Sequence, residues 1–373
     1  MVSMSDEQMM AAPVVGGRAR PARAGASDGD AAGGRPLAEH NSLGAIGFSF
    51  GDRALESAIG ARLATIEKAL HENVASADPF VAETAAHLLS AGGKRFRPLL
   101  VTLAASFGDV AAAEVTEAAV VVELTHLATL YHDDVMDEAA KRRGAPSANA
   151  RWGNSVAILV GDYLFARAAD VAAGLGVDAV RIQARTFSRL VHGQLAETVG
   201  PRDGDPIAHH LQVIADKTGS LIATSARFGA MFGGVPAADV EALSTYGETI
   251  GVAFQLSDDL LDIASESRQS GKTPGTDLRE GIHTLPMLYA LADDAVDADA
   301  VRLRDLLRSG PLTDDAWHAE ALGLLRASPA MGQARRTVRG FAERARAELA
   351  LLPDLPQRTA LESLCDVIAD RTG

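Results

Sequence analysis

The sequence predicts an all-α protein built as one large domain, and three observations point to this fold class. From about residue 50 onward, apolar residues recur at intervals of three and four, the spacing of one helix face. Strict alternation of apolar and polar residues, which indicates a half-buried strand, is almost absent. Gly and Pro cluster between the periodic segments. The hydrophobic content of 47% over 373 residues is enough for a sizeable core.

The helical segments follow one another along the chain without a short-period repeat. The first four are rich in Ala, Leu and Val and cover residues 54–74, 79–91, 97–108 and 112–134. The predicted turns lie at 91–98, 142–154, 200–206, 232–236 and 271–281. We therefore expect a dozen or so helices in a single domain, residues 46–373.

Residues 1–45 differ in composition from the rest of the chain. They are rich in Gly, Ala, Arg, Ser and Pro, as in "GGRARPARAGASDGDAAGGRP", and have no sustained periodicity. This composition predicts a disordered low-complexity extension. The arginines are also found in organellar transit peptides, but Asp28, Asp30 and the missing apolar face favour a simple extension.

The charge balance and the single cysteine limit which partners the chain is expected to bind and in which compartment it is expected to act. With 35 Lys and Arg against 49 Asp and Glu, the net charge of −14 disfavours binding to nucleic acid or to an anionic membrane. Cys365 alone forms no intrachain disulfide and no thiolate metal site. The sequence contains no transmembrane run and no secretion signal, so we expect a cytoplasmic protein.

Two aspartate clusters interrupt apolar helical sequence. Asp133, Asp134 and Asp137 end the segment "YHDDVMD", and "QLSDDLLDIA" repeats the DDxxD spacing. On a helix the first and last aspartates of such a motif lie one turn apart on one face, where they repel each other unless a cation is present. Mg²⁺ fits carboxylates better than Zn²⁺ does here, because no His or Cys spacing indicates zinc. A solvated acidic surface would explain one motif better than two.

Four clusters of cations alternate with the aspartate motifs. Glycines in "GGKRFRP" accompany Lys94, Arg95 and Arg97, and "KRRG" holds Arg142 and Arg143. "DKTGS" holds Lys217 and Thr218, and "GKTPGTDL" holds Lys272. Each alone is typical of a surface cation or a helix cap. Together they indicate two anionic groups held by metal and by Arg or Lys above an apolar interior, which suits the ionisation of a lipid diphosphate.

These motifs resemble those of the trans-prenyl diphosphate synthases, also called the polyprenyl synthetase family, over roughly residues 50–370. The resemblance rests on "GGKRFRP", "ELTHLATLYHDDVMDEAAKRRG", "GDYLFARA", "DKTGSL", "FQLSDDLLD" and "GKTPGTDLREGIHTLP", in the expected order. It implies a helical bundle of the isoprenoid synthase type with a central apolar cavity. It also implies a bacterial long-chain member that acts as a homodimer and condenses isopentenyl diphosphate with an allylic diphosphate.

The resemblance assigns roles to individual residues. A cluster of three Mg²⁺ would be bound by Asp133, Asp137 and Asp258. The allylic diphosphate would contact Arg142, Lys217, Thr218, Gln255 and Lys272, and isopentenyl diphosphate would contact Lys94, Arg97, His126 and Arg143. The implied catalytic set is Asp133, Asp134, Asp137, Arg142, Lys217, Asp258, Asp259 and Lys272. As a lone His on an apolar helix, His126 would otherwise be interpreted as a core residue.

Side chains before Asp133 bear on product length. Thr125, Ala128 and Thr129 lie one or more turns before it and are small or medium in size, whereas short-chain relatives place a bulky aromatic at the position of Ala128. This favours a long all-trans product of about six or more isoprene units, of the kind used as a quinone side chain. Phe165, Leu164 or a residue of a dimer partner could still close the tunnel, which would give a short-chain product.

Two further alternatives stay open at the level of sequence. A terpene cyclase shares the all-α fold and an aspartate motif, but the aromatic content of 5% is low for cradling carbocations. A non-catalytic partner subunit would be expected to lose aspartates or diphosphate cations, and this sequence keeps them.

Overall fold

Helices form nearly all the regular structure of the described residues, so the predicted all-α class is confirmed. The computed structural model describes residues 50–265 and 274–371. The predicted extension, residues 1–45, and Lys272 lie outside the described residues. The described ranges belong to one compact unit, Asn41–Gly373.

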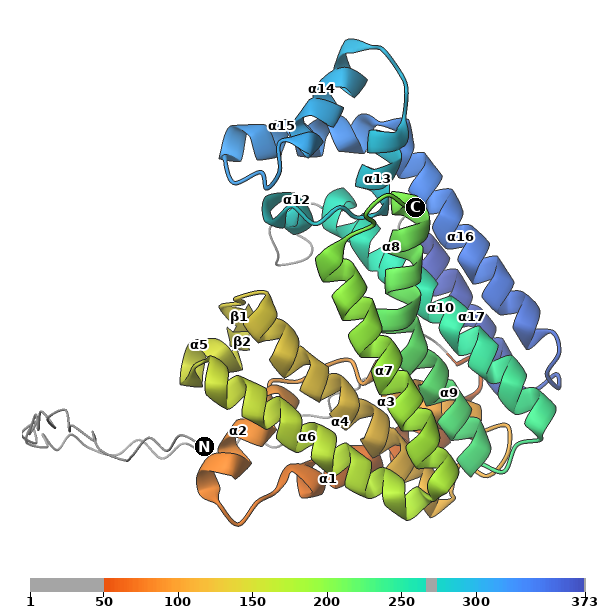
Figure 1. The fold of residues 1–373 in the computed structure, drawn as a ribbon. Helices are drawn as coiled ribbons and strands as arrows, with labels where there is room; N and C mark the ends of the chain where they lie inside the picture. The colour runs from red at the N-terminus through yellow and green to blue at the C-terminus, as the bar shows by residue number, and fades with distance from the viewer. Residues whose placement is uncertain (1–49, 266–273, 372–373) are drawn as a thin grey trace, which may run out of the picture. The chain divides into compact units, whose positions relative to one another are not determined.

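The elements follow one another in chain order (Figure 1). They are α1 (Arg53–Val74), α2 (Pro79–Ser90), α3 (Phe96–Ala105), α4 (Ala113–Met136), β1 (Lys141–Arg142), β2 (Ala145–Pro146), α5 (Ala148–Trp152), α6 (Asn154–Leu175), α7 (Val177–Val199), α8 (Pro206–Ile214), the π-helix η2 (Ala215–Gly219), α9 (Ser220–Phe232), α10 (Ala237–Ala264), α12 (Thr276–Glu280), α13 (Leu285–Ala292), α14 (Ala298–Arg308), α15 (Asp315–Ala327), α16 (Pro329–Leu349) and α17 (Pro356–Asp370).

Aspartates define where several helices begin. The carboxylate of Asp52 accepts a hydrogen bond from the backbone N–H of Leu55, and Asp78 and Asp205 cap α2 and α8 in the same way. Both α2 and α8 then start with a proline, whose missing N–H costs nothing in the first turn. Local sequence therefore fixes these helix starts.

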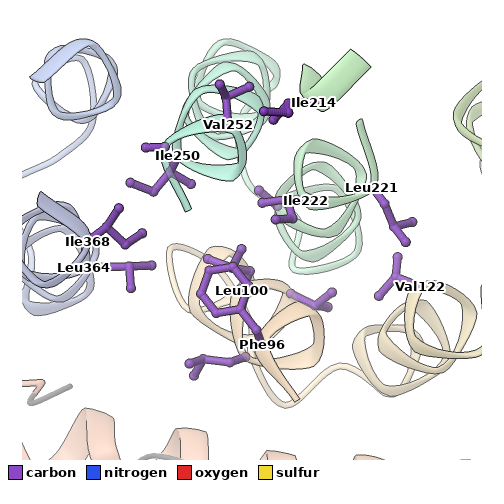
Figure 2. Packing of buried hydrophobic residues seen from close by; sticks show 14 of the residues in the cluster. Phe96, Leu100, Val122, Ile214, Leu221, Ile222, Ile250, Val252, Leu364 and Ile368 are labelled. Atoms are coloured by element: carbon purple, nitrogen blue, oxygen red, sulfur yellow. The ribbon is translucent and has the colours of Figure 1, made fainter. Parts of the chain in front are cut away.

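The core is built around α3. Every residue of this helix except Arg97 is buried, which is typical of a helix surrounded by others. Figure 2 shows Phe96 and Leu100 of α3 facing apolar side chains of α9, α10 and α17. Gly229 permits the closest approach, because a Cβ there would lie 2.0 Å from the carbonyl oxygen of Val101. Backbone packing of α3 on α9 thus requires a glycine at this position.

The two aspartate motifs lie on long helices that are anchored in this core. α4 packs against α6 and α9, and α10 packs against α9 and α16. The predicted turn after α4 contains a two-stranded antiparallel hairpin, in which Arg142 pairs with Ala145. No helix within 50–265 and 274–371 is both long enough and apolar enough to cross a membrane.

Candidate functional site

A cavity of about 730 Å³ is lined by residues of α3, α4, α6, α7, η2, α9, α10 and the β1–β2 hairpin. Its lining combines charged groups with aromatic and aliphatic side chains. The predicted site residues among the lining are Lys94, Arg97, His126, Thr129, Asp133, Arg142, Arg143, Lys217, Thr218, Gln255 and Asp258. The fold therefore brings both aspartate motifs and three of the four cation clusters to one cavity.

Other predicted site residues are absent from the cavity lining. Thr125, Ala128, Asp134 and Asp259 are buried, whereas Asp137 is exposed at the end of α4. The side chains of Thr125 and Ala128 are buried in the core, whereas Thr129 reaches the lining. Of the three positions assigned to product length, Thr129 is thus the one that faces the cavity.

In the first motif the three aspartates have different surroundings. Asp133 lines the cavity, and desolvation raises its pKa to about 6; Lys217 lowers the pKa and Asp137 raises it. Asp134 is fully buried and accepts a 2.6 Å hydrogen bond from Nε of Arg142. Asp137 caps the carboxyl end of α4, where the helix dipole is unfavourable for an anion. The cluster therefore favours a bound cation beside Asp133 and Asp137.

The β1–β2 hairpin carries two arginines, of which Arg142 contacts this motif and Arg143 contacts the backbone of Leu88 and Gly92. Arg143 and Gly144 form its two-residue turn and both have positive φ, 53° and 79°, as a type I′ turn requires. Arg142 precedes the turn, and its Nη2 lies 3.9 Å from Asp137. Gly144 thus allows the tight turn that pairs Ala145 with Arg142.

In the second motif, Asp258 is the residue that lines the cavity. Burial raises its pKa, against the opposing effects of Arg371 and Lys94, and Nη2 of Arg371 donates to it at 3.0 Å. Asp259 is buried and accepts from Nε2 of Gln255 at 3.0 Å. Asp262 accepts from the backbone N–H groups of residues 276 and 277, at 3.2 Å each. The last aspartate of this motif is therefore held by backbone.

The residues predicted to contact isopentenyl diphosphate lie where the loop before α3 meets α4. Nη1 of Arg143 donates to the backbone oxygens of Leu88, at 2.8 Å, and Gly92. Burial lowers the pKa of Arg97 to about 10, and burial followed by the nearby arginines holds the pKa of His126 well below its usual value. At neutral pH, His126 is therefore an uncharged imidazole among cations.

Two further charged residues belong to this site: Arg95, which the sequence placed in the cation cluster of "GGKRFRP" without a substrate role, and Glu123, which it did not assign. Both are buried and both line the cavity. The signal that identifies Glu123 is a carboxylate in the apolar run "AAVVVELTHL", because a buried charge needs a partner. The partner lies far away in the sequence, so spacing alone could not reveal it.

Lys217 and Thr218 lie on η2, a one-turn π-helix between α8 and α9. Such turns are frequent at functional sites because they shift side chains around the helix axis. Lys217 donates to Glu197 at 2.6 Å, and the hydroxyl of Thr218 donates to Oε1 of Gln255 at 3.3 Å. Arg189 supports the turn by bonding to Asp216 at 2.8 Å. Lys217 and Thr218 thus form a second group of hydrogen-bond donors in the cavity, separate from the arginines near α3, and Lys217 acts on the charge of Asp133.

Three tilted rings cluster in one part of the wall. Phe165 on α6 and Phe187 on α7 have ring centroids 4.3 Å apart, and the ring of His132 lies 5.6 Å from Phe165. All three line the cavity beside Asp133. This surface suits a hydrocarbon that extends from the charged groups.

Comparisons with known proteins identify similar sequences with related names. The family model described as polyprenyl synthetase matches residues 78–322. Nonaprenyl diphosphate synthase of Mycobacterium tuberculosis is 53% identical over 329 residues, which are 88% of this chain and 97% of that protein.

Solved structures of similar proteins cover nearly the same region. Geranylgeranyl pyrophosphate synthase from Corynebacterium glutamicum, crystallised with calcium and isoprenyl diphosphate, is 46% identical with a TM-score of 0.79, over 87% of this chain and 99% of that one. A decaprenyl diphosphate synthase from Rhodobacter capsulatus is 34% identical with a TM-score of 0.77, over 86% and 99%. The names of these proteins include both short and long products.

Proposed function

Because this chain belongs to the polyprenyl synthetase family, we propose that its cavity condenses isopentenyl diphosphate head to tail (1′-4) with an allylic diphosphate. The chain is an enzyme, a trans-polyprenyl diphosphate synthase. The observation that carries the proposal is the meeting of Asp133, Asp258 and two separate groups of cations around one cavity with an apolar wall. A protein that binds one diphosphate would need only one such group of cations.

Mg²⁺ fits the residues present. The donors are carboxylate oxygens, and within the described ranges no three His, Cys, Asp or Glu side chains gather as a metal site formed by protein alone. Mg²⁺ commonly binds one or two carboxylates and completes its shell with water and substrate phosphate. Asp133, Asp137 and Asp258 would hold a cluster of three ions, which when bound neutralises the charge that develops on the departing diphosphate.

The chain's own donors would hold the two substrates in reacting positions. Arg142, Lys217, Thr218 and Gln255 would bind the allylic diphosphate, together with Lys272. Lys94, Arg97, Arg143 and neutral His126 would bind isopentenyl diphosphate. With both diphosphates fixed, the allylic C–O bond breaks, the double bond of isopentenyl diphosphate attacks the allylic carbon, and a proton is lost to the released diphosphate.

A long product of the type used as a quinone side chain is the form of this activity that we favour. Its support is the 53% identity to a nonaprenyl diphosphate synthase and the position of the small Thr129 on the cavity wall. The alternative is a short product, geranyl, farnesyl or geranylgeranyl diphosphate. The Phe165 and Phe187 rings favour it, because bulky side chains in the cavity lining leave less room for a long hydrocarbon.

The assembly that we propose is a homodimer in the cytoplasm. Large apolar side chains are exposed along α6 and α7, including Leu159, Val177, Val180 and Leu195. A second copy that covers these helices would remove this surface from water. Sedimentation or light scattering of the purified chain tests this, and a monomer at micromolar concentration would contradict it.

The deciding experiment is an incubation with Mg²⁺, labelled isopentenyl diphosphate and each of the dimethylallyl, geranyl, farnesyl and geranylgeranyl primers. Chains longer than about six isoprene units support the long-chain form. A stop at geranylgeranyl diphosphate or earlier supports the short-chain alternative. No product from any primer would contradict the proposed activity and favour a non-catalytic partner subunit.

A further inference from the structure

We propose that Glu123 is a positioning residue whose buried carboxylate holds the cations of the isopentenyl diphosphate site in place before that substrate arrives. This inference rests on the proposed function. Glu123 lies on α4 one turn before His126, and its side chain is 2% exposed. The other carboxylates of the cavity lining are Asp133 and Asp258, which begin the two aspartate motifs. Glu123 is thus the lining carboxylate left without a role in metal binding.

Its ion-pair partner, Arg95, is held from several directions. Nη1 of Arg95 lies 3.4 Å from Oε1 of Glu123. Nε and Nη2 donate to the two carboxylate oxygens of Glu67 at 2.7 and 2.8 Å, and Nη2 also donates to the carbonyl oxygen of Leu89 at 3.0 Å. The guanidinium therefore joins α1, the end of α2 and α4 in one network, in which Glu123 supplies the link to α4.

The backbone of Arg95 connects this network to the substrate cations. Arg95 has a φ of 48° in the left-handed region, which non-glycine residues adopt only when their surroundings hold them there. Lys94 immediately precedes it, and Arg97 follows two residues later at the start of α3. Fixing the Arg95 side chain therefore fixes the loop that presents Lys94 and Arg97 to the cavity.

Charge repulsion makes such a link necessary. At Gly93 a Cβ would lie 2.9 Å from Cζ of Arg143 and 3.0 Å from Nη1 of Arg95, so both guanidinium groups crowd the same glycine. Burial lowers the pKa of Arg97 and of Arg143; Glu123 opposes this shift in both, and Arg143 lowers the pKa of Arg97 further. Without Glu123, three arginines would face each other with no carboxylate from α4, and we expect them to separate.

The opposite effect of Glu123 on the substrate provides the alternative hypothesis. A carboxylate beside a diphosphate also repels it. If Glu123 only repelled the substrate, its replacement by Gln would tighten diphosphate binding. If it positions the cations, the same change weakens binding. The cations would then have to become ordered when the substrate binds, and this ordering makes the binding free energy less favourable.

Steady-state kinetics of the full chain with Mg²⁺ separate the two hypotheses. For Glu123→Gln we expect the KM for isopentenyl diphosphate to rise by about tenfold while the KM for the allylic primer stays unchanged. Glu123→Asp, which keeps the charge on a shorter side chain, should fall between Gln and the wild type. Glu241→Gln is the matched control, because it also removes a carboxylate paired with an arginine, Arg227, but on α10 away from the lining.

Titration of inorganic diphosphate into the metal-free protein gives a second readout that needs no turnover. We expect Glu123→Gln to bind about tenfold more weakly than wild type and Glu241→Gln to bind equally well. Unchanged or tighter binding by Glu123→Gln, or an equal rise in both KM values, overturns the inference. If Glu123→Gln does not fold, wild-type values for Glu123→Asp overturn it. A wild type that binds diphosphate but makes no product would instead contradict the proposed function.

Discussion

The two aspartate motifs share one spacing but occupy different environments. In each, the first aspartate lines the cavity and the second is buried against an internal donor, Arg142 for Asp134 and Gln255 for Asp259. The third aspartates differ. Asp137 is 58% exposed at the end of α4, whereas Asp262 bonds to two backbone N–H groups at the start of α12.

This difference shows what DDxxD spacing does and does not determine. Helix geometry alone turns the first aspartate toward the cavity and the second toward the core in both motifs. The third position depends on the surroundings of the helix end. α4 ends just before Asp137, whereas α10 continues past Asp262 and the backbone at the start of α12 bonds to that aspartate. The spacing therefore predicts equal roles for the first aspartates and leaves the role of the third undetermined.

The largest effect is expected from removing the first aspartates. Asp133→Ala and Asp258→Ala should each lower kcat by at least about a thousandfold, because each takes away an oxygen ligand where charge develops in the transition state. Circular dichroism should stay close to wild type, and the thermal midpoint should not fall. If either variant keeps near wild-type turnover, the assignment of that aspartate to metal binding is wrong.

The third aspartates should separate function from stability. Asp137→Asn should reduce kcat about ten- to a hundredfold with little change in the thermal midpoint, because its side chain is exposed at a helix end. Asp262→Asn should cost about 1–2 kcal/mol in the free energy of unfolding, since it weakens two hydrogen bonds to backbone. Urea unfolding and initial rates are measured on both variants. A large loss of stability in Asp137→Asn together with a large loss of activity in Asp262→Asn would contradict the contrast.

The aromatic neighbours of the motifs give a third contrast. Phe165 belongs to the cluster of tilted rings beside Asp133, whereas Phe254, one turn before Asp258, lines the same cavity from α10 and stacks on Phe96 with ring centroids 4.9 Å apart. Phe165→Ala should lengthen the product by at least about one isoprene unit, because it opens space in the wall beside the first motif. Phe254→Ala should leave the product length unchanged. Chromatography of the products decides, and equal lengthening in both variants would contradict a tunnel along α6 and α7.

Much of this arrangement could be predicted from sequence, because it depends on local rules. Helical periodicity and the Gly and Pro clusters give the all-α class and several helix ends, and the two motifs identify Asp133 and Asp258. Features that depend on distant contacts were not predictable. Three such features are the π-helix at Lys217, the pairing of Glu123 with Arg95, and the hydrogen bonds from the backbone of α12 to Asp262. Each depends on a contact that residue spacing within one helix does not predict. Likewise, Thr125 and Ala128 precede Asp133 at helical intervals, but neighbouring helices cover them.

The last effect concerns the stability of the metal-free protein at different pH, and it involves no turnover. Since burial raises the pKa of Asp133 from 3.8 to about 6, the folded state binds a proton more tightly than the unfolded state, and stability falls as pH rises from about 4 to 6. Above pH 6 the charged carboxylate lowers the free energy of unfolding by about 3 kcal/mol at most. Asp133→Asn should therefore be more stable than wild type at pH 7.5, and the difference should disappear near pH 4. At Asp258 the gain should be smaller, because Arg371 already pairs with it. Calorimetry in EDTA measures both differences, and a gain at Asp258 equal to that at Asp133 would show that Arg371 does not stabilise the second motif.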